Sequence, residues 1–243
     1  MPMRRGGRRG RRRAVTRVKR QYAEANINQG VKIKEMLDET GMVLMGTKDL
    51  KVQNLTIIRQ GTEIDDRERQ TARIVGIKID GYFLNSFNVD GGVSPQIPLI
   101  VNMAIVFPKH DITLPTSNFF RREGGIVRGQ EFYDTGNLDG LDYATKAINS
   151  DKIGVLWRKK FWLANAVTNS GYSSGSAGST KMLTKYVPLY RSVQYTGSGA
   201  DSCDDKLYLI WWCSAPSEPT GTGNTKGCYY NLRVRTYFRD PKN

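Results

Sequence analysis

The chain has 243 residues, 39% of them hydrophobic, and carries a formal net charge of +14. No apolar run approaches the ~18 residues of a membrane-spanning helix, and the first residues lack the apolar stretch of a secretory signal, so we expect no stable membrane association. The cysteines Cys203, Cys213 and Cys228 are odd in number and form no C-x-x-C pair, which argues against a disulfide framework or a zinc site.

The first twenty residues, MPMRRGGRRG RRRAVTRVKR, hold ten Lys and Arg residues and no acidic residue, and so supply +10 of the net charge of +14. Like charges repel and the glycines add backbone freedom, so we expect an arm that is disordered until a polyanion neutralises it. Guanidinium groups suit phosphate because they donate to two oxygens and stay charged. Two alternative roles for these residues are a nuclear localisation signal and a tail that only increases solubility. The predicted nucleic-acid-binding residues of the arm are Arg4, Arg5, Arg8, Arg9, Arg11, Arg12, Arg13, Arg17, Lys19 and Arg20.

Residues 21–48 form a transitional segment. Within it, VKIKEMLDE (31–39) fits two helical turns, with Ile33, Met36 and Leu37 on one face, and fits a short strand equally well. The sequence leaves this choice open.

From residue 49 to residue 243 the pattern is that of a β-domain. Seven segments are rich in β-branched or aromatic residues and are bounded by Gly, Pro, Asn, Asp or Ser. They are residues 50–58, 72–87, 97–107, 153–164, 182–195, 206–215 and 228–239. An eighth, weaker strand is placed at QEFYD (130–134) or at YATKAI (143–148), which also fits a short helix.

This arrangement predicts an all-β, single-domain sandwich of two sheets, with a jelly roll as the leading version. The connection 108–152 is unusually long for a compact domain, which is typical of a functional insertion. No internal repeat or second domain is visible.

The sequence offers little for catalysis, and we expect no enzyme. His110 is the only histidine and has no triad or metal partners nearby. No phosphate-binding loop, nucleophile elbow or zinc-protease motif occurs. We therefore assign no catalytic residue and no cofactor.

Two acidic clusters are candidate metal sites. They are Glu63, Asp65, Asp66 and Glu68 in one turn, and Asp201, Asp204 and Asp205 in another. Such carboxylates could hold Ca²⁺ between subunits. Because the spacing of a calcium loop is absent, we favour solvated loops, or carboxylates that pair with Arg67 and Arg69 of a neighbour, and assign no metal.

The last predicted strand has two different faces. Arg233, Arg235, Tyr237 and Arg239 alternate with Leu232, Val234, Thr236 and Phe238. A basic face with an aromatic ring can line a polyanion and stack bases, so Arg233 and Arg235 join the predicted nucleic-acid-binding residues. The cluster 158–160 in WRKKFW is a weaker candidate.

The stretch IIRQGTEIDDRERQTARIVGIKIDGYF (57–83) resembles the capsid proteins of small circular single-stranded DNA viruses that encode a Rep protein. These capsids are similar to those of geminiviruses and satellite tobacco necrosis virus. The resemblance lies in a strand followed by Gln60-Gly61-Thr62, a charged turn with Arg67 and Arg69, and a strand of the form I-x-G-x-x-I. The Arg-rich arm and WRKKFWL agree in order, whereas the Cys/His cluster of the plant relatives is missing.

The resemblance implies an eight-stranded jelly roll that assembles with itself into an icosahedral shell of about 60 copies. It implies an arm that faces the packaged single-stranded DNA and also binds a host nuclear import receptor, so that the protein occurs in the virion and in the host nucleus. The alternatives are a satellite RNA virus coat protein and a non-viral, basic-tailed β-sandwich module that binds nucleic acid or another ligand.

Overall fold

The structure is a computed structural model. The residues that it describes are 30–46, 49–85, 98–109, 114, 119–120, 145, 147–163, 180–214 and 227–240. Their strands are β1 (Lys32–Asp38), β2 (Val43–Gly46), β3 (Leu50–Asn54), β4 (Thr71–Asn85), β5 (Leu99–Pro108), β6 (Ile153–Leu163), β7 (Thr180–Gln194), β8 (Tyr208–Ser214) and β9 (Gly227–Arg239). No helix among these residues is long and apolar enough to cross a bilayer.

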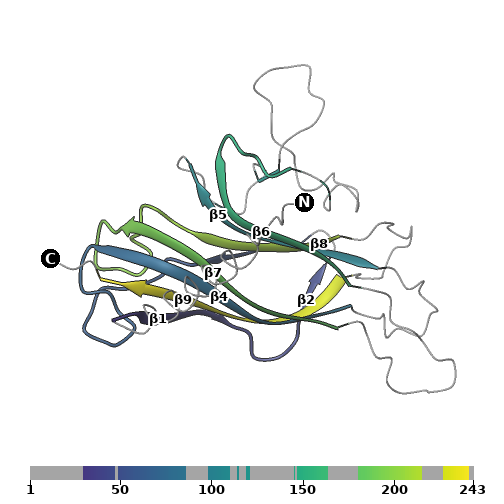
Figure 1. The fold of residues 1–243 in the computed structure, drawn as a ribbon, viewed down its shortest axis with the longest axis horizontal. Coiled ribbons are helices and arrows are strands. Elements are labelled where there is room, and N and C mark those ends of the chain that lie inside the picture. The colour runs from purple at the N-terminus through teal and green to yellow at the C-terminus, as the bar shows by residue number, and fades with distance from the viewer. Residues whose placement is uncertain are drawn as a thin grey trace, which may run out of the picture.

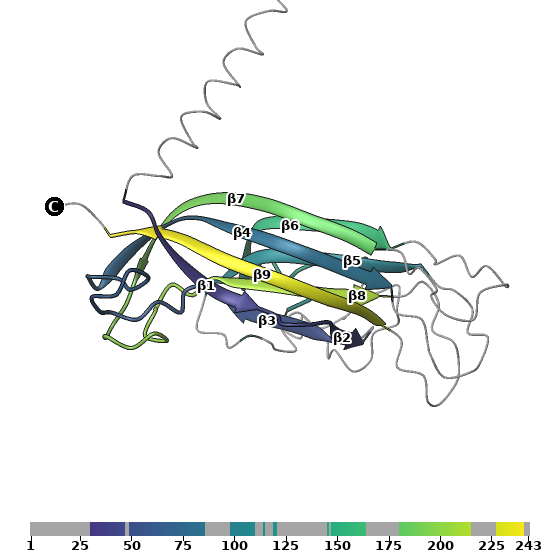
Figure 2. The same cartoon turned by 90° about the horizontal axis from the view of Figure 1, so that it is seen from below.

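The strands form two antiparallel sheets that pack face to face (Figures 1 and 2). One sheet has the order β1-β9-β4-β7, with β2 also paired to β9, and the other has the order β3-β8-β5-β6. From β2 onward, every connection passes from one sheet to the other except the connection from β5 to β6. This crossing pattern leaves β7 and β6 as edge strands of the two sheets.

The main core lies between the sheets and follows the strand period of two. In β9, Leu232, Val234, Thr236 and Phe238 are fully buried, whereas Arg233 is exposed. The predicted division of this strand into an apolar and a basic face is confirmed.

A second apolar cluster covers the outer face of the β3-β8-β5-β6 sheet. Phe119 and Phe120 come from the long connection between β5 and β6, and their ring centroids lie 5.5 and 5.4 Å from that of Trp212 in β8. The described part of the predicted long insertion therefore serves to bury apolar surface. This explains why β8 is buried at all seven positions.

All seven strong strand predictions are confirmed as β3 to β9, and the all-β class with them. The ambiguous segment 31–39 is a strand, β1, and a further short strand, β2, follows it within the predicted transitional segment. Nine strands are described, whereas eight were expected. The difference arises in the transitional segment, where β1 and β2 are two separate strands that pair with successive stretches of the same partner, β9. Of the two candidates for the eighth strand, 130–134 lies outside the described residues, and 143–148 is described only at 145, 147 and 148, where Ile148 forms an isolated bridge with Phe120.

Candidate nucleic-acid interface

The ten predicted contacts of the arm, and His110, lie outside the described residues. The two predicted contacts in the body, Arg233 and Arg235, lie on the outward face of β9, flanked by β1 and β4. Their surroundings can therefore be described atom by atom.

Arg233 is held by two carboxylates of β1. Its Nε atom donates to Oε1 of Glu35 at 2.5 Å, and its Nη2 atom lies 3.8 Å from Oδ2 of Asp38. The hydrogen bond to Glu35 raises the pKa of Arg233 above its ordinary value. The positive charge at this position is thus largely balanced by β1.

Arg235 faces the other neighbour, β4. Its Nη2 atom donates to Oδ2 of Asp80 at 2.6 Å, and Lys78 approaches the same oxygen at 3.2 Å. Arg235 keeps one buried donor, Nε, without a partner. The structure brings Arg233 and Arg235 to one face, as predicted, and surrounds them with acidic side chains from strands distant in sequence.

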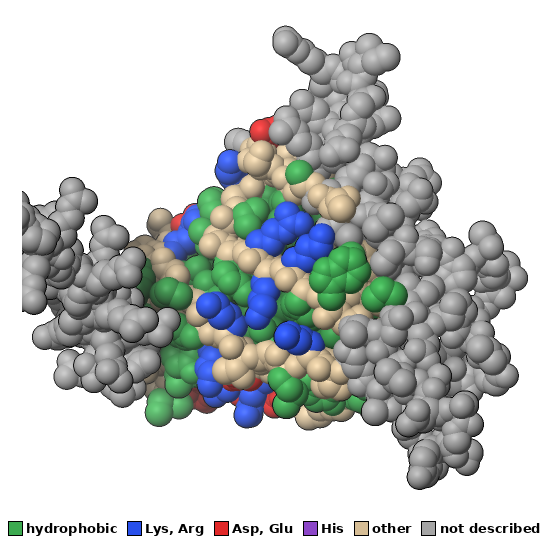
Figure 3. Space-filling model, turned by 45° about the vertical axis from the view of Figure 1, so that its right-hand side comes forward, with side chains coloured by type: hydrophobic (Ala, Val, Ile, Leu, Met, Phe, Trp, Pro, Cys, Tyr) green, Lys and Arg blue, Asp and Glu red, His purple; other side chains and the backbone are tan. Residues whose placement is uncertain are grey.

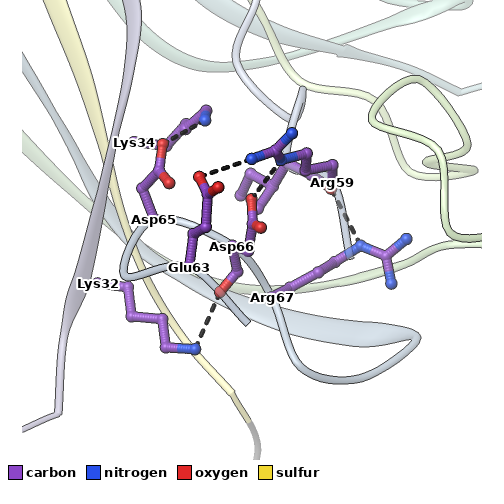
Figure 4. A network of polar contacts seen from close by, with 8 residues as sticks. Lys32, Lys34, Arg59, Glu63, Asp65, Asp66 and Arg67 are labelled. Atoms are coloured by element: carbon purple, nitrogen blue, oxygen red, sulfur yellow. Dashed lines mark hydrogen bonds and ion pairs between the residues drawn. The ribbon is translucent and has the colours of Figure 1, made fainter. Parts of the chain in front are cut away.

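The charged turn after β3 forms a polar network with β1 (Figure 4). Arg59 donates through Nε to Asp66 at 2.9 Å and through Nη2 to Glu63 at 2.6 Å. Lys34 of β1 donates to Asp65. The carboxylate oxygens of Glu63, Asp65 and Asp66 lie within 4.8 Å of one another, and each of these carboxylates already has a cationic partner.

These partners differ from the cations considered in the sequence. Within the chain, the acidic turn is engaged by Arg59 and Lys34. Asp66 is 2% exposed and occupies the space beside Gly61, where an added Cβ atom would lie 2.2 Å from its Oδ2 atom. The glycine of the Gln-Gly-Thr motif therefore has a packing role.

Arg67 is fully buried and anchors the turn to the sandwich. It donates to the backbone carbonyls of Ile58, Arg69 and Gly197, and its guanidinium carbon lies 4.0 Å from the ring centroid of Tyr195. An arginine that is enclosed in this way is unavailable to phosphate, so its role is structural.

The basic residues of β6 are weak candidates in the sequence, and those of β7 are no candidates there. Arg158, Lys160, Lys181 and Lys185 are exposed, and Lys159 is partly buried. The lysines of β7 were missed because no cluster marks them in the sequence; they become neighbours of β6 only when the two edge strands meet.

Comparisons with known proteins return structural matches only. No protein-family model and no curated protein sequence matches the chain. One similar solved structure is that of Desmodium yellow mottle tymovirus, with 10% identity, a TM-score of 0.33, and coverage of 88% of this chain and 87% of that one. Another is a 60-mer BFDV capsid protein, with 12% identity, a TM-score of 0.28, and coverage of 88% and 92%.

Proposed function

We propose that this chain is a non-enzymatic capsid subunit that assembles with itself into a small icosahedral shell and packages single-stranded DNA through residues 1–20. The observation that carries the proposal is the joining of an arm with ten positive charges and no acidic residue to an antiparallel two-sheet sandwich. The arm provides charge neutralisation, and the sandwich provides a rigid body with defined faces.

The strand order supports a jelly roll. Orders β1-β9-β4-β7 and β3-β8-β5-β6, with repeated passage between the sheets, follow from a long hairpin that folds over on itself. Exposed apolar side chains, including Ile64 at 89% and Met182 at 75%, give the body surface that neighbouring copies could cover. Both features fit a subunit that closes into a shell.

The arm is expected to bind by counterion release. If all ten charges met phosphates on a single strand, the log–log slope of affinity against salt would be roughly −7 from the arm alone. Such contacts position the nucleic acid without reading its sequence, which suits packaging.

Deletion of residues 1–20 tests this proposal. The shortened chain should still fold, since the arm precedes every described strand, but it should no longer retain nucleic acid in particles. Negative-stain microscopy and the ratio of absorbance at 260 and 280 nm report the two outcomes. Normal packaging by the shortened chain would overturn the role of the arm, and a persistent monomer under all salt and pH conditions would favour a binding module.

Nuclease digestion identifies the packaged polymer. Nucleic acid extracted from particles should be degraded by a DNase and resist an RNase. The reverse result would identify a satellite RNA virus coat protein, since backbone neutralisation by arginine does not distinguish the two sugars.

We also propose that the exposed arm is a nuclear import signal before assembly. A fluorescent protein fused to residues 1–20 should accumulate in the nucleus, and a fusion with all ten basic residues replaced by Gln should not. Equal distribution of the two fusions would contradict this role.

A further inference from the structure

The edge strands β6 and β7 form a seam between the two sheets, and this seam is strongly basic. β6 is the last strand of one sheet and β7 the last strand of the other, and the two lie side by side (Figures 1 and 2). Arg158, Lys159 and Lys160 belong to β6, and Lys181, Lys185 and Arg191 to β7, whereas neither strand contains an acidic residue. We call this surface the β6–β7 seam.

Three lysines point into the mouth of the seam from both sheets. Lys159 is paired with Met103 in β5, and Lys181 and Lys185 are paired with Phe83 and Ile79 in β4. These partners belong to the main core, so the lysines occupy inward-facing positions of edge strands. Their ammonium groups therefore reach the open side of the sandwich.

A second row of side chains continues the seam on the outer face of β6. Arg158, Lys160 and Trp162 alternate along the strand and share this face. Trp162 is 57% exposed, which is unusual for so large an apolar ring. Figure 3 shows Lys and Arg side chains gathered across this side of the molecule, with hydrophobic side chains between them.

The seam differs from the face of β9 in charge balance. Arg233 and Arg235 are paired with Glu35, Asp38 and Asp80. No ion pair is recorded for Arg158, Lys159, Lys181 or Lys185 within the described part of the chain. These four cations of the seam therefore lack a described acidic partner, whereas both arginines of β9 have one.

From this contrast we infer that the packaged single-stranded nucleic acid contacts the body of the subunit at the β6–β7 seam rather than at Arg233 and Arg235. This inference rests on the proposed function. The lysines meet phosphates, and the ring of Trp162 provides a surface for base stacking. A sulfated polysaccharide would match the charge, but it has no aromatic base to stack on Trp162.

The arm can reach the same polymer. β1, which the arm precedes, lies three strand spacings from β7 in its sheet, a distance of about 14 Å. Twenty extended residues span up to ~66 Å. One strand of nucleic acid can therefore contact the arm and the seam together.

The test compares two charge-matched variants of the full chain. Lys181→Gln/Lys185→Gln removes two charges from the seam, and Arg233→Gln/Arg235→Gln removes two from β9. Binding of a fluorescent oligothymidylate is measured by anisotropy between 50 and 200 mM salt. The seam variant should flatten the log–log salt slope by about 1.4, so that its affinity falls about sevenfold less across this range than that of the unaltered chain. The β9 variant should keep the slope of the unaltered chain.

Two further variants separate charge and stacking from structural effects. Lys181→Arg/Lys185→Arg keeps the charge and should retain the slope. Trp162→Ala should weaken oligothymidylate binding at least about fivefold and leave dextran sulfate binding unchanged. Circular dichroism confirms that each variant is folded.

Three results would overturn the inference. The first is an equal salt slope for the two Gln variants, and the second is a flatter slope in the β9 variant alone. The third is a Trp162→Ala variant that loses dextran sulfate binding while its oligothymidylate binding stays intact. In each case, particles that still contain DNA would leave the proposed function standing. Failure of the unaltered chain to form particles or to retain nucleic acid would instead remove the proposed function itself.

Discussion

Arg67 shows how one buried cation can organise a turn. Its guanidinium group joins three backbone carbonyls, two from the turn and one, that of Gly197, from the loop after β7. The ring of Tyr195 lies against it, and the Tyr195 hydroxyl donates to the carbonyl of Thr56 at 3.1 Å. Burial raises the pKa of Tyr195, so that hydroxyl stays protonated. The group fastens the charged turn to the end of the sandwich.

Replacing Arg67 with Met should destabilise the fold by about 3 kcal/mol, because the buried carbonyls lose their donors and cannot reach water. The measurement is the midpoint of denaturant unfolding, at an unchanged slope m. Arg69→Met is the matched control, since this side chain is exposed and its loss should change stability by less than about 0.5 kcal/mol. A similar midpoint for the two variants would contradict the anchoring role.

The ion pair between Lys34 and Asp65 makes a pH-dependent contribution. The hydrogen bond from Lys34 is the main cause that lowers the pKa of Asp65. A carboxyl group whose pKa is lower in the folded state stabilises the fold above its unfolded pKa of about 3.9, and the contribution is lost as the pH falls through the folded value. Asp65 is therefore a source of stability at neutral pH that acid removes.

Asp65→Asn should accordingly lower stability at pH 7, and the difference from the unaltered chain should shrink below about pH 4. Thermal unfolding at a series of pH values measures this. Asp201→Asn, at an exposed position, is the control and should give no such pH-dependent difference. A difference for Asp65→Asn that stays constant down to pH 2 would contradict the assigned ion pair.

At the scale of elements, β1 explains why one segment could not be assigned from sequence. Its register with β9 shifts between Glu35 and Leu37, which interrupts the period of two and leaves apolar side chains at a spacing that also fits a helix. β1 forms a strand because β9 pairs with it along the whole length of β1. Such pairing comes from a part of the chain about 200 residues away, beyond the range of a local pattern.

The edge strands illustrate a second property of elements, protection against unwanted pairing. Lys159, Lys181 and Lys185 point inward at open sheet edges, which is a common device against edge-to-edge aggregation. This role is compatible with nucleic-acid binding at the same seam.

Lys181→Val/Lys185→Val should therefore increase aggregation of the purified chain, because it makes the inward face of an edge strand more continuously apolar. Light scattering at rising protein concentration measures the effect. Thr184→Val lies on the same strand but opposite Asp80, on the other face, and should aggregate less. Equal scattering for the two variants would contradict a protective role of the lysines.

At the scale of the whole molecule, the sequence predicted the sandwich and its faces but not its charge balance. The seven strands were visible because each carries its own apolar or alternating pattern, and the alternation of β9 correctly predicted which side chains are buried. The partners of Arg233 and Arg235 were not visible, because Glu35, Asp38 and Asp80 meet them only through sheet pairing. The seam was missed for the same reason, since it joins strands of different sheets.

The cysteines provide a test of how the sandwich opens. Cys213 in β8 and Cys228 in β9 belong to opposite sheets and are fully buried, and the Cys213 thiol donates to the carbonyl of Gly46 at 3.4 Å. A hydrogen bond with Cys213, together with burial, raises the pKa of Cys228. Cys203 is 3% exposed and lies in the loop between β7 and β8. Only separation of the sheets exposes the first two thiols.

In the variant Cys203→Ser, a thiol reagent should therefore label Cys213 and Cys228 together, at the rate of global unfolding. The labelling rates of both cysteines should rise with denaturant concentration in parallel with the unfolding rate. Mass spectrometry should show unlabelled and doubly labelled chains with few singly labelled ones. The unaltered chain should gain a third label earlier, because opening of the loop that holds Cys203 needs no separation of the sheets. Rapid labelling of Cys228 alone would contradict the packing of β9 against β8, since a thiol reacts only when a reagent can reach it as thiolate.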